Sequence, residues 1–253
     1  MVKKLLFITF LILLFSCKET SVATETSTRT LALLEKSKAI QLRAEKVEKH
    51  MREWQDSLDR FGDKQAAQNA IDDNDFVDIE KLSNYFVLDM KYATEDNFLK
   101  KAVYSCAKCY VRGVVAKALI NANKDFMKKG YRIKLFDCYR PYSVQKKMWK
   151  IFPNPGYVAD PKGGSIHNKG AAVDITLTDL QGNQLDMGTT FDHFGKEAHH
   201  AYKELSDEVI ANRKLLRSIM EKHGFSIIRT EWWHYNFKSD TKFKISDFRW
   251  KCT

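Results

Sequence analysis

The spacing of apolar residues predicts three helices in the C-terminal two thirds of the chain. Over 111–128 and 206–223, apolar residues recur every three or four positions, as on one face of a helix. Gly224 follows the second of these stretches, where a helix commonly ends. A third stretch, 142–152, mixes polar and apolar residues and is entered through Pro141, which favours a helix start.

Strict alternation of apolar and polar residues predicts strands between these helices. The clearest is 173–178, and 131–137 shows the same period of two. Short aromatic-rich stretches at 226–230 and 234–237 predict two closing strands. Because strands and helices are interleaved, we expect an α+β fold, with one compact domain over 76–253 built on a central, mainly antiparallel sheet flanked by helices.

A separate helix is expected before this domain. The segment 18–75 begins as a Ser/Thr-rich tether, and apolar residues from Ile40 to Phe61 then recur in steps of four and three. The run 72–75, three aspartates and one asparagine, breaks the pattern. These apolar residues form a seam along one face of the predicted helix, long enough for a weak coiled coil. An amphipathic helix that docks on the domain is the favoured interpretation.

The first residues predict export. Lys3 and Lys4 precede an apolar run over 5–15, which is too short to span a membrane but typical of a signal peptide. The Ser16-Cys17 pair after this run resembles a bacterial lipoprotein signal, in which residues 1–16 are removed and Cys17 is lipidated. We therefore expect an exported, periplasmic protein held at the membrane by a lipid anchor; an ordinary signal peptide and a soluble periplasmic protein are the alternative.

The net charge alone would suggest an anionic partner. The chain has 42 Lys+Arg and 32 Asp+Glu, for a formal charge of +10. Removing residues 1–16 takes away two lysines and leaves +8. The basic residues are spread over several segments without a base-stacking motif, and an exported chain rarely meets nucleic acid, so no nucleic-acid partner is expected.

Four cysteines remain after Cys17, namely Cys106, Cys109, Cys138 and Cys252. An even number in an oxidising compartment predicts disulfides, and the sequence does not choose among the three pairings. The Cys106-x-x-Cys109 spacing is that of half a zinc ribbon, but the chain has no second such pair, so structural zinc is not expected.

Two segments combine residue types suited to a metal centre. His167 and Asp174 lie seven positions apart after paired glycines, with Asp174 on the polar face of a strand expected to be half-buried. Glu231 and His234 lie three apart beside two tryptophans. Two histidines and one carboxylate match a catalytic zinc site with one open position, and Glu231 would be placed to take a proton from water. On spacing alone, each histidine could equally be a hydrogen-bonded core residue.

A third segment, 136–142, places an arginine between a strand and a helix. Arg140 at the end of the predicted strand would point into a cleft. The alternative is an ordinary ion pair with the neighbouring Asp137.

Together these motifs resemble a known family, the zinc D-alanyl-D-alanine dipeptidases, a VanX-like group of D,D-peptidases related to Hedgehog domains. The resemblance covers about residues 76–250 and implies the Hedgehog/D,D-peptidase-like fold. It rests on motifs that occur in the family's order: Lys91-Tyr92-Ala93-Thr94 with Asp96-Asn97-Phe98, Asp137-x-Tyr139-Arg140-Pro141, Ser165-x-His167-x-x-Gly170-x-Ala172-x-Asp174, Met187-Gly188-Thr189 with Phe191-Asp192, Arg217-Ser218-Ile219-Met220, and Glu231-Trp232-Trp233-His234.

The resemblance implies a role for each of eight residues. His167, Asp174 and His234 would ligate Zn²⁺, Glu231 would act as general base, and Arg140 would stabilise the oxyanion. Tyr92 and Asp192 would hold the substrate ammonium, and Ser165 would help to bind its carboxylate. The segment 160–164 is longer than the corresponding family loop, and the N-terminal helix and the four cysteines are additions.

The implied activity is zinc-dependent hydrolysis of D-Ala-D-Ala or a close D,D-dipeptide. A D,D-carboxypeptidase or endopeptidase acting on peptidoglycan stem peptides is the alternative enzyme. A lipoprotein that binds the wall or a partner through a degenerate site is the alternative without catalysis.

Overall fold

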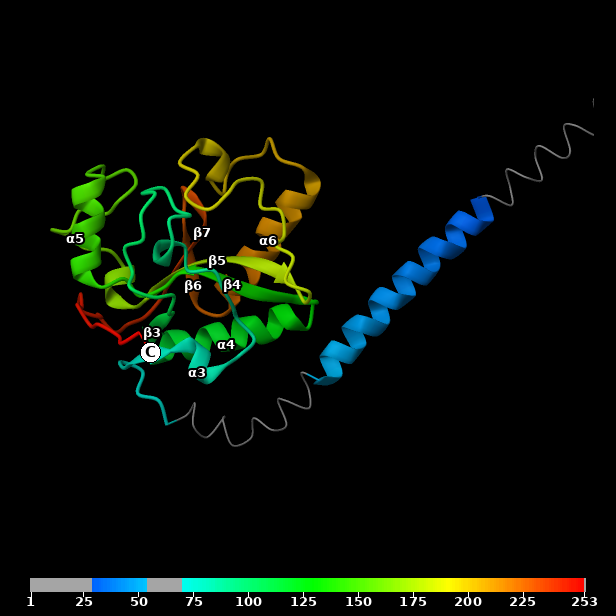
Figure 1. Cartoon of the computed structure of the whole chain (residues 1–253), viewed down its shortest axis with the longest axis horizontal. Helices are drawn as coiled ribbons and strands as arrows, with labels where there is room; N and C mark the ends of the chain where they lie inside the picture. Colours follow the sequence, from blue (N-terminus) through cyan, green and yellow to red (C-terminus); the bar gives the residue numbers. More distant parts are fainter. Residues whose placement is uncertain (1–28, 54–69, 253) are drawn as a thin grey trace, which may run out of the picture. The chain divides into compact units, whose positions relative to one another are not determined.

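The computed structural model describes residues 29–53 and 70–252, which fall into two units divided after Trp54. Residues 29–53 form one helix, drawn in blue in Figure 1. No described helix is both long and apolar enough to cross a lipid bilayer. The predicted signal peptide 1–16, Cys17 and the second half of the predicted N-terminal seam lie outside the described residues.

The second unit is built on a five-stranded sheet in the order β2-β4-β5-β7-β6. Only β2 and β4 pair in parallel, and the other neighbours are antiparallel, which confirms the predicted α+β fold with its mainly antiparallel sheet. Two further strands, β1 and β3, form a small antiparallel pair. The strand bounds are β1 Phe76–Asp78, β2 Val87–Leu88, β3 Tyr110–Arg112, β4 Tyr131–Asp137, β5 Ala172–Asp179, β6 Phe225–Ile228 and β7 Glu231–Phe237.

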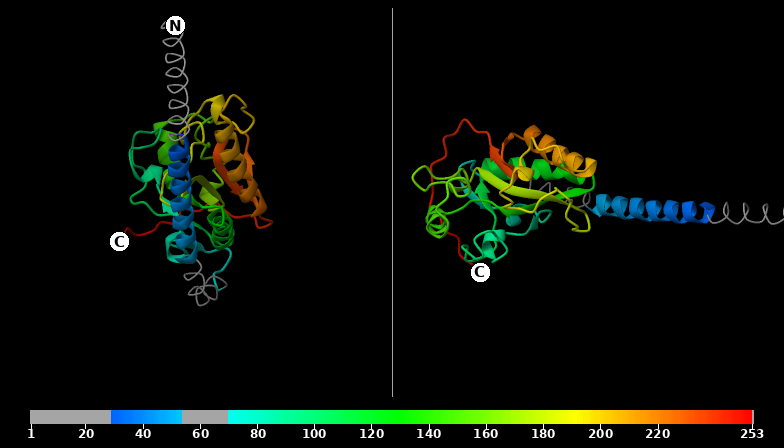
Figure 2. Two further views of the ribbon diagram at one scale, coloured as in Figure 1. Left: turned by 90° about the vertical axis from the view of Figure 1, so that its right-hand side faces the viewer. Right: turned by 90° about the horizontal axis from the view of Figure 1, so that it is seen from above.

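Two long helices cover one face of this sheet. α4 packs against β4 and α6 against β6, and the two helices lie side by side (Figures 1 and 2). The Ser206 hydroxyl caps α6 by accepting a hydrogen bond from the backbone N–H of Val209. The helix bounds are α3 Ile79–Leu82, α4 Gly113–Met127, α5 Tyr142–Ile151 and α6 Asp207–Lys222, with short 3₁₀ turns η1 Lys91–Ala93, η2 His167–Lys169 and η3 Lys196–Ala198.

The structure corrects three of the predicted elements. The helix expected from residue 111 begins at Gly113, because Val111 and Arg112 pair with β1. β5 is buried on both faces rather than half-buried, and its threonines Thr176 and Thr178 have no exposed surface. β5 is also the middle strand of the sheet, paired with β4 on one edge and β7 on the other. β7 begins at Glu231, earlier than expected, so both chemical residues of that motif lie on the strand itself.

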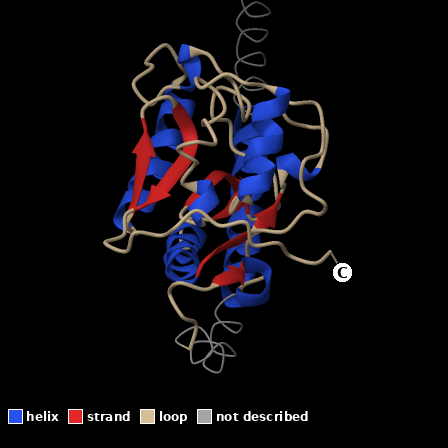
Figure 3. Ribbon diagram, turned by 90° about the vertical axis from the view of Figure 1, so that its left-hand side faces the viewer, coloured by secondary structure: helices blue, strands red, loops and turns tan. Residues whose placement is uncertain are grey.

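The four cysteines form two disulfides, Cys106–Cys252 and Cys109–Cys138. The Cys-x-x-Cys motif is therefore divided between two bridges. The first bridge fixes the end of the C-terminal segment 238–252, which runs without helix or strand across one side of the domain (Figure 3). Aromatic rings of this segment, including Phe248 and Trp250, pack on rings of the small sheet and of Tyr139.

Candidate metal centre and active site

Three potential metal ligands from separate elements meet at one point. His167 lies on η2, Asp174 on β5 and His234 on β7, where Asp174 and His234 are direct cross-strand partners. All three are buried, and one ligand atom from each lies within 4.8 Å of the others. Folding thus brings together residues that are up to 67 positions apart in sequence.

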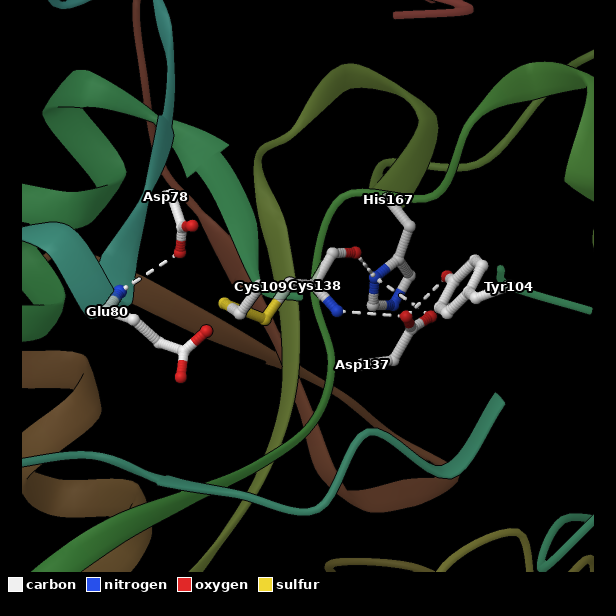
Figure 4. The surroundings of a disulfide bond; sticks show 7 residues. All are labelled: Asp78, Glu80, Tyr104, Cys109, Asp137, Cys138 and His167. Carbon is white, nitrogen blue, oxygen red and sulfur yellow. Dashed lines mark hydrogen bonds and ion pairs between the residues drawn. A yellow bond between two sulfur atoms is a disulfide. The ribbon is translucent and has the colours of Figure 1, made fainter. Parts of the chain in front are cut away.

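The hydrogen bonds of the two imidazoles leave one nitrogen of each for a metal. His167 Nδ1 donates to the backbone carbonyl of Cys138 at 2.7 Å (Figure 4), since a carbonyl can only accept. His234 Nε2 lies 2.8 Å from the Asn236 side-chain oxygen, which also accepts. The remaining atoms, His167 Nε2 and His234 Nδ1, lie 3.2 Å apart and face the carboxylate of Asp174. Two oriented imidazoles and one carboxylate are a donor set that fits zinc.

These ligands line a cavity of about 400 Å³. The cavity wall also contains every other residue for which a role was expected from the sequence, namely Tyr92, Arg140, Ser165, Asp192 and Glu231. The structure therefore places all eight candidate residues around one space.

Glu231 lies at the start of β7, three residues before His234 on the same strand. Burial raises the pKa of Glu231 above its usual value, against the opposing charge of His234. The next two residues, Trp232 and Trp233, are almost fully buried and pack edge to face. A carboxyl with a raised pKa in a water-poor wall is suited to proton transfer near neutral pH.

Asp192 and Tyr92 form a polar pair in the cavity wall. The Tyr92 hydroxyl lies 3.1 and 3.2 Å from the two carboxylate oxygens of Asp192 and donates to them. Asp192 has a positive φ of 59°, which is uncommon for a residue other than glycine. Burial raises the pKa of Asp192 well above its usual value, and the charge of Asp174 raises it further. An added cation would relieve this destabilised carboxylate.

Arg140 is both paired and directed toward the cavity. Its Nε and Nη2 donate to one oxygen of Asp137 at 3.2 and 2.7 Å, and its Nη1 donates to the Gln145 side-chain oxygen at 2.9 Å. The other oxygen of Asp137 accepts from the Tyr104 hydroxyl at 2.6 Å (Figure 4). The ion pair offered by the sequence as an alternative to a cleft role exists, and Arg140 nevertheless lines the cavity.

Most of the chain matches a known protein family. Residues 72–249 match the family model described as D-ala-D-ala dipeptidase, Peptidase_M15. The chain belongs to this dipeptidase family. A D-alanyl-D-alanine dipeptidase of Escherichia coli K12 is 33% identical over 181 residues, covering 72% of this chain and 94% of that protein. One of Enterococcus faecalis V583 is 34% identical over 187 residues, covering 64% of this chain and 91% of that protein.

Among solved structures, the LD-carboxypeptidase LdcB aligns with 21% identity and a TM-score of 0.37, over 67% of this chain and 70% of that one. The assignment to the dipeptidase family, whose members are hydrolases of the metallopeptidase class, rests on the sequence matches.

Within this dipeptidase fold, Ser165 has a local structural task besides lining the cavity. Its hydroxyl accepts from the backbone N–H of His167 at 3.3 Å, and its own N–H donates to the Asn168 side chain at 2.7 Å. Both contacts fix the turn that carries His167. Tyr157, which precedes the segment 160–164, also lines the cavity, and its ring packs on that of Phe194 with the ring centroids 4.1 Å apart.

The residues that hold the candidate site residues in place were not predicted from the sequence, although one of them had a signal there. Asn236 had a detectable signal, because it lies two positions after His234 on one strand and therefore on the same face. Gln145 and Tyr104 had none, since one is on α5 and the other in a loop before β3. Cys138 acts through its backbone carbonyl, which no residue type reveals.

Proposed function

We propose that the chain hydrolyses D-Ala-D-Ala, or a close D,D-dipeptide, with zinc held by His167, Asp174 and His234. The convergence of this ligand set with Glu231 and Arg140 in one cavity is the observation that carries the proposal. When bound, zinc would supply a Lewis acid and lower the pKa of water at the open position.

Glu231 is proposed as the proton carrier. Its carboxylate would accept a proton from the attacking water and later give it to the departing amine. Its raised pKa supports this double task, because a carboxyl of ordinary acidity holds a proton poorly near neutral pH. Trp232 and Trp233 would limit competing water around it.

Arg140 is proposed to stabilise the negative oxygen that forms on the scissile carbonyl. A guanidinium has five N–H groups. Contacts with Asp137 and Gln145 occupy three of those of Arg140, and the side chain also lines the cavity. Because the side chain is fixed on both sides, it would need little reorganisation as charge develops.

Substrate length is proposed to be set by Asp192 with Tyr92. A half-buried carboxylate whose charge is opposed by its surroundings favours a cationic group, and the free ammonium of a dipeptide is such a group. Ser165 is proposed to face the other end of the substrate and to help hold its carboxylate. A stem peptide has no ammonium next to the scissile bond, so this pair favours dipeptide hydrolysis over the carboxypeptidase or endopeptidase alternative.

For location, we propose export to the periplasm and anchoring to the membrane through lipid on Cys17. The proposal rests on the charge and hydrophobic pattern of residues 1–17. Cells labelled with a fatty-acid analogue should yield labelled protein, and Cys17→Ser should lose the label. Labelled Cys17→Ser would contradict the lipid anchor, and an unlabelled but processed wild type would favour the soluble alternative.

The enzymatic proposal is tested by comparing D-Ala-D-Ala with L-Ala-L-Ala, N-acetyl-D-Ala-D-Ala and intact muropeptides, with and without a chelator. We expect chelator-sensitive release of D-alanine from the free D,D-dipeptide alone. Cleavage of the acetylated dipeptide or of muropeptides at a similar rate would favour the alternative enzyme.

The assignment of Glu231 is tested with Glu231→Ala, which should keep bound zinc and lose activity by at least a hundredfold. Glu208→Ala, in the exposed first turn of α6, serves as the matched control and should remain fully active. Full activity of Glu231→Ala would refute the mechanism, and a wild type that binds no zinc would favour the binding lipoprotein.

A further inference from the structure

The two disulfides differ in where they lie. Cys109 and Cys138 have no exposed surface, and their bridge joins the residue before β3 to the residue after β4. Cys252 is exposed and Cys106 half-buried, at the edge of the domain. Only the buried bridge includes a residue in contact with the metal centre, because the Cys138 carbonyl accepts from His167.

Cys138 connects the metal centre to the arginine through its two backbone groups. Its carbonyl holds His167 Nδ1 at 2.7 Å, which leaves Nε2 facing the other ligands. Its N–H donates to Asp137 at 2.9 Å, and Asp137 in turn holds Arg140. Figure 4 shows the bridge, the carbonyl contact and Asp137 within one small region. A displacement of this residue would therefore move both a proposed zinc ligand and the proposed oxyanion group.

The two stretches that carry these residues are also joined directly. The backbone N–H of Arg140 donates to the backbone carbonyl of His167 at 3.1 Å, and the Asn168 side-chain amide donates to the backbone carbonyl of Arg140 at 2.8 Å. On its other side, the 138–140 stretch is held to the small sheet by the Cys109–Cys138 bridge and by the Tyr139 N–H, which donates to the Tyr110 carbonyl. The bridge is the covalent member of this set.

We propose that the Cys109–Cys138 disulfide is a positioning element of the active site, which fixes the Cys138 backbone so that His167 and Arg140 are held in register with each other. The proposal rests on the proposed zinc-dependent activity. It gives the buried cysteines a task beyond stability, and it makes full activity dependent on folding in an oxidising compartment.

The test compares two double variants of the full chain, Cys109→Ala with Cys138→Ala and, as control, Cys106→Ala with Cys252→Ala. Zinc affinity is measured by competition with a chromogenic chelator, kcat and KM with D-Ala-D-Ala, and Tm by circular dichroism. All binding and activity assays are run well below the lower Tm.

The two variants should rank differently in thermal stability and in function: the control should lose at least as much Tm, and the variant without the buried bridge should lose more zinc affinity and kcat. The control bridge closes a loop of 146 residues and the buried bridge one of 29, so chain entropy makes the control variant lose at least as much Tm. Removing the buried bridge should instead lower zinc affinity and kcat by about tenfold each, with KM little changed, as expected when support of a metal ligand is lost. The control variant should keep both values within about twofold.

The control is suitable because other contacts hold the C-terminal segment. Asp247 accepts from the backbone N–H and the hydroxyl of Ser143, and the Phe248 carbonyl accepts from the Tyr139 hydroxyl. None of these contacts involves Cys106 or Cys252, so we expect them to remain when the bridge is removed.

Three results separate the inferences. Unchanged zinc affinity and kcat in the Cys109/Cys138 variant, or a larger loss in the control, would overturn the positioning role while leaving the proposed function intact. A wild type without zinc binding or dipeptide hydrolysis would overturn both. If the double alanine variant does not fold, Cys109→Val with Cys138→Ala restores part of the buried volume and replaces it. This variant too should lose more zinc affinity and kcat than the Cys106/Cys252 control.

Discussion

Asp137 and Arg140 form a buried ion pair, and its contacts indicate how much free energy of unfolding is lost when one partner is removed. Asp137 has no exposed surface, and Arg140 is 7% exposed. Arg140→Met would leave the Asp137 carboxylate buried without its cation. Breaking such a pair from one side costs about 3–5 kcal/mol. The low end, about 3 kcal/mol, is expected, because the other oxygen of Asp137 keeps its donors from Tyr104 and the Cys138 backbone.

The double variant distinguishes a coupled pair from two independent residues. Asp137→Asn alone should also cost about 3 kcal/mol, since it leaves the guanidinium without a counter-charge. Asp137→Asn with Arg140→Met removes both charges, so its cost should be well below the sum, with a coupling energy of about 2–3 kcal/mol. Urea unfolding of all four proteins, followed by tryptophan fluorescence, measures this cycle.

Activity provides a second, separate measure of Arg140. Loss of one oxyanion donor typically lowers kcat by about 10²–10³-fold. Arg140→Met should show such a loss at a urea concentration of zero, where the variant is still folded. Additive unfolding costs within about 0.5 kcal/mol would refute the coupled pair. Unchanged kcat in folded Arg140→Met would refute the catalytic role while leaving the structural one.

Two further predictions concern stability. Gly170 has a φ of 72°, and an added Cβ would lie 2.5 Å from the Phe76 ring; Gly130 has a φ of 84° with no atom within 4 Å of such a Cβ. Gly170→Ala should therefore cost about 2–3 kcal/mol or more in urea unfolding and Gly130→Ala about 1 kcal/mol, and equal costs would contradict the steric argument. Burial, followed by the charges of two arginines, lowers the pKa of His200 to about 4, below its unfolded value of 6.5. Between pH 6.5 and about 4 the unfolded chain is protonated at this ring while the folded protein is not, so acid favours unfolding. The free energy of unfolding should therefore be full above pH 6.5 and fall as the pH drops from 6.5 through about 4. The fall should be less than about 1.4 kcal/mol per pH unit, since the ring is partly exposed. His200→Gln should flatten this part of the pH profile of unfolding, and an unchanged slope would contradict it.

Elements with several periods of a clear pattern were predictable from the sequence. β4, α5 and α6 lie within one or two residues of the expected ranges, because each repeats its apolar spacing often enough to define a face. β1, β2 and β3 are two or three residues long, which is too short for any period, and they depend on pairing with distant strands. The alternating pattern of β5 predicted one exposed face, and the burial of its threonines depends on tertiary packing that the strand's own residues do not reveal.

The candidate residues that the structure brings to one cavity were named together from the sequence, but the contacts that support them were not. Motif resemblance selected His167, Asp174 and His234 where spacing alone left them open, and folding places their ligand atoms together. The orienting partners of the two histidines are a backbone carbonyl and a side-chain amide. Disulfide pairing was also undetermined, since it depends on which cysteines folding brings close.

The sign of the net charge misleads about the site itself. The chain carries +10, yet the cavity is acidic. Asp174, Asp192 and Glu231 line it, and the only cation among its described lining residues other than histidine, Arg140, is already matched by Asp137. If all are ionised, three carboxylates remain without a counter-charge in a buried space, which is costly unless cations enter. A divalent zinc ion would offset two of these charges. A free dipeptide carries one ammonium and one carboxylate and adds no net charge, whereas an N-acylated dipeptide keeps only the carboxylate and adds one further negative charge. An N-acylated dipeptide brings no ammonium, and the electrostatics of the cavity therefore disfavour it independently of its size.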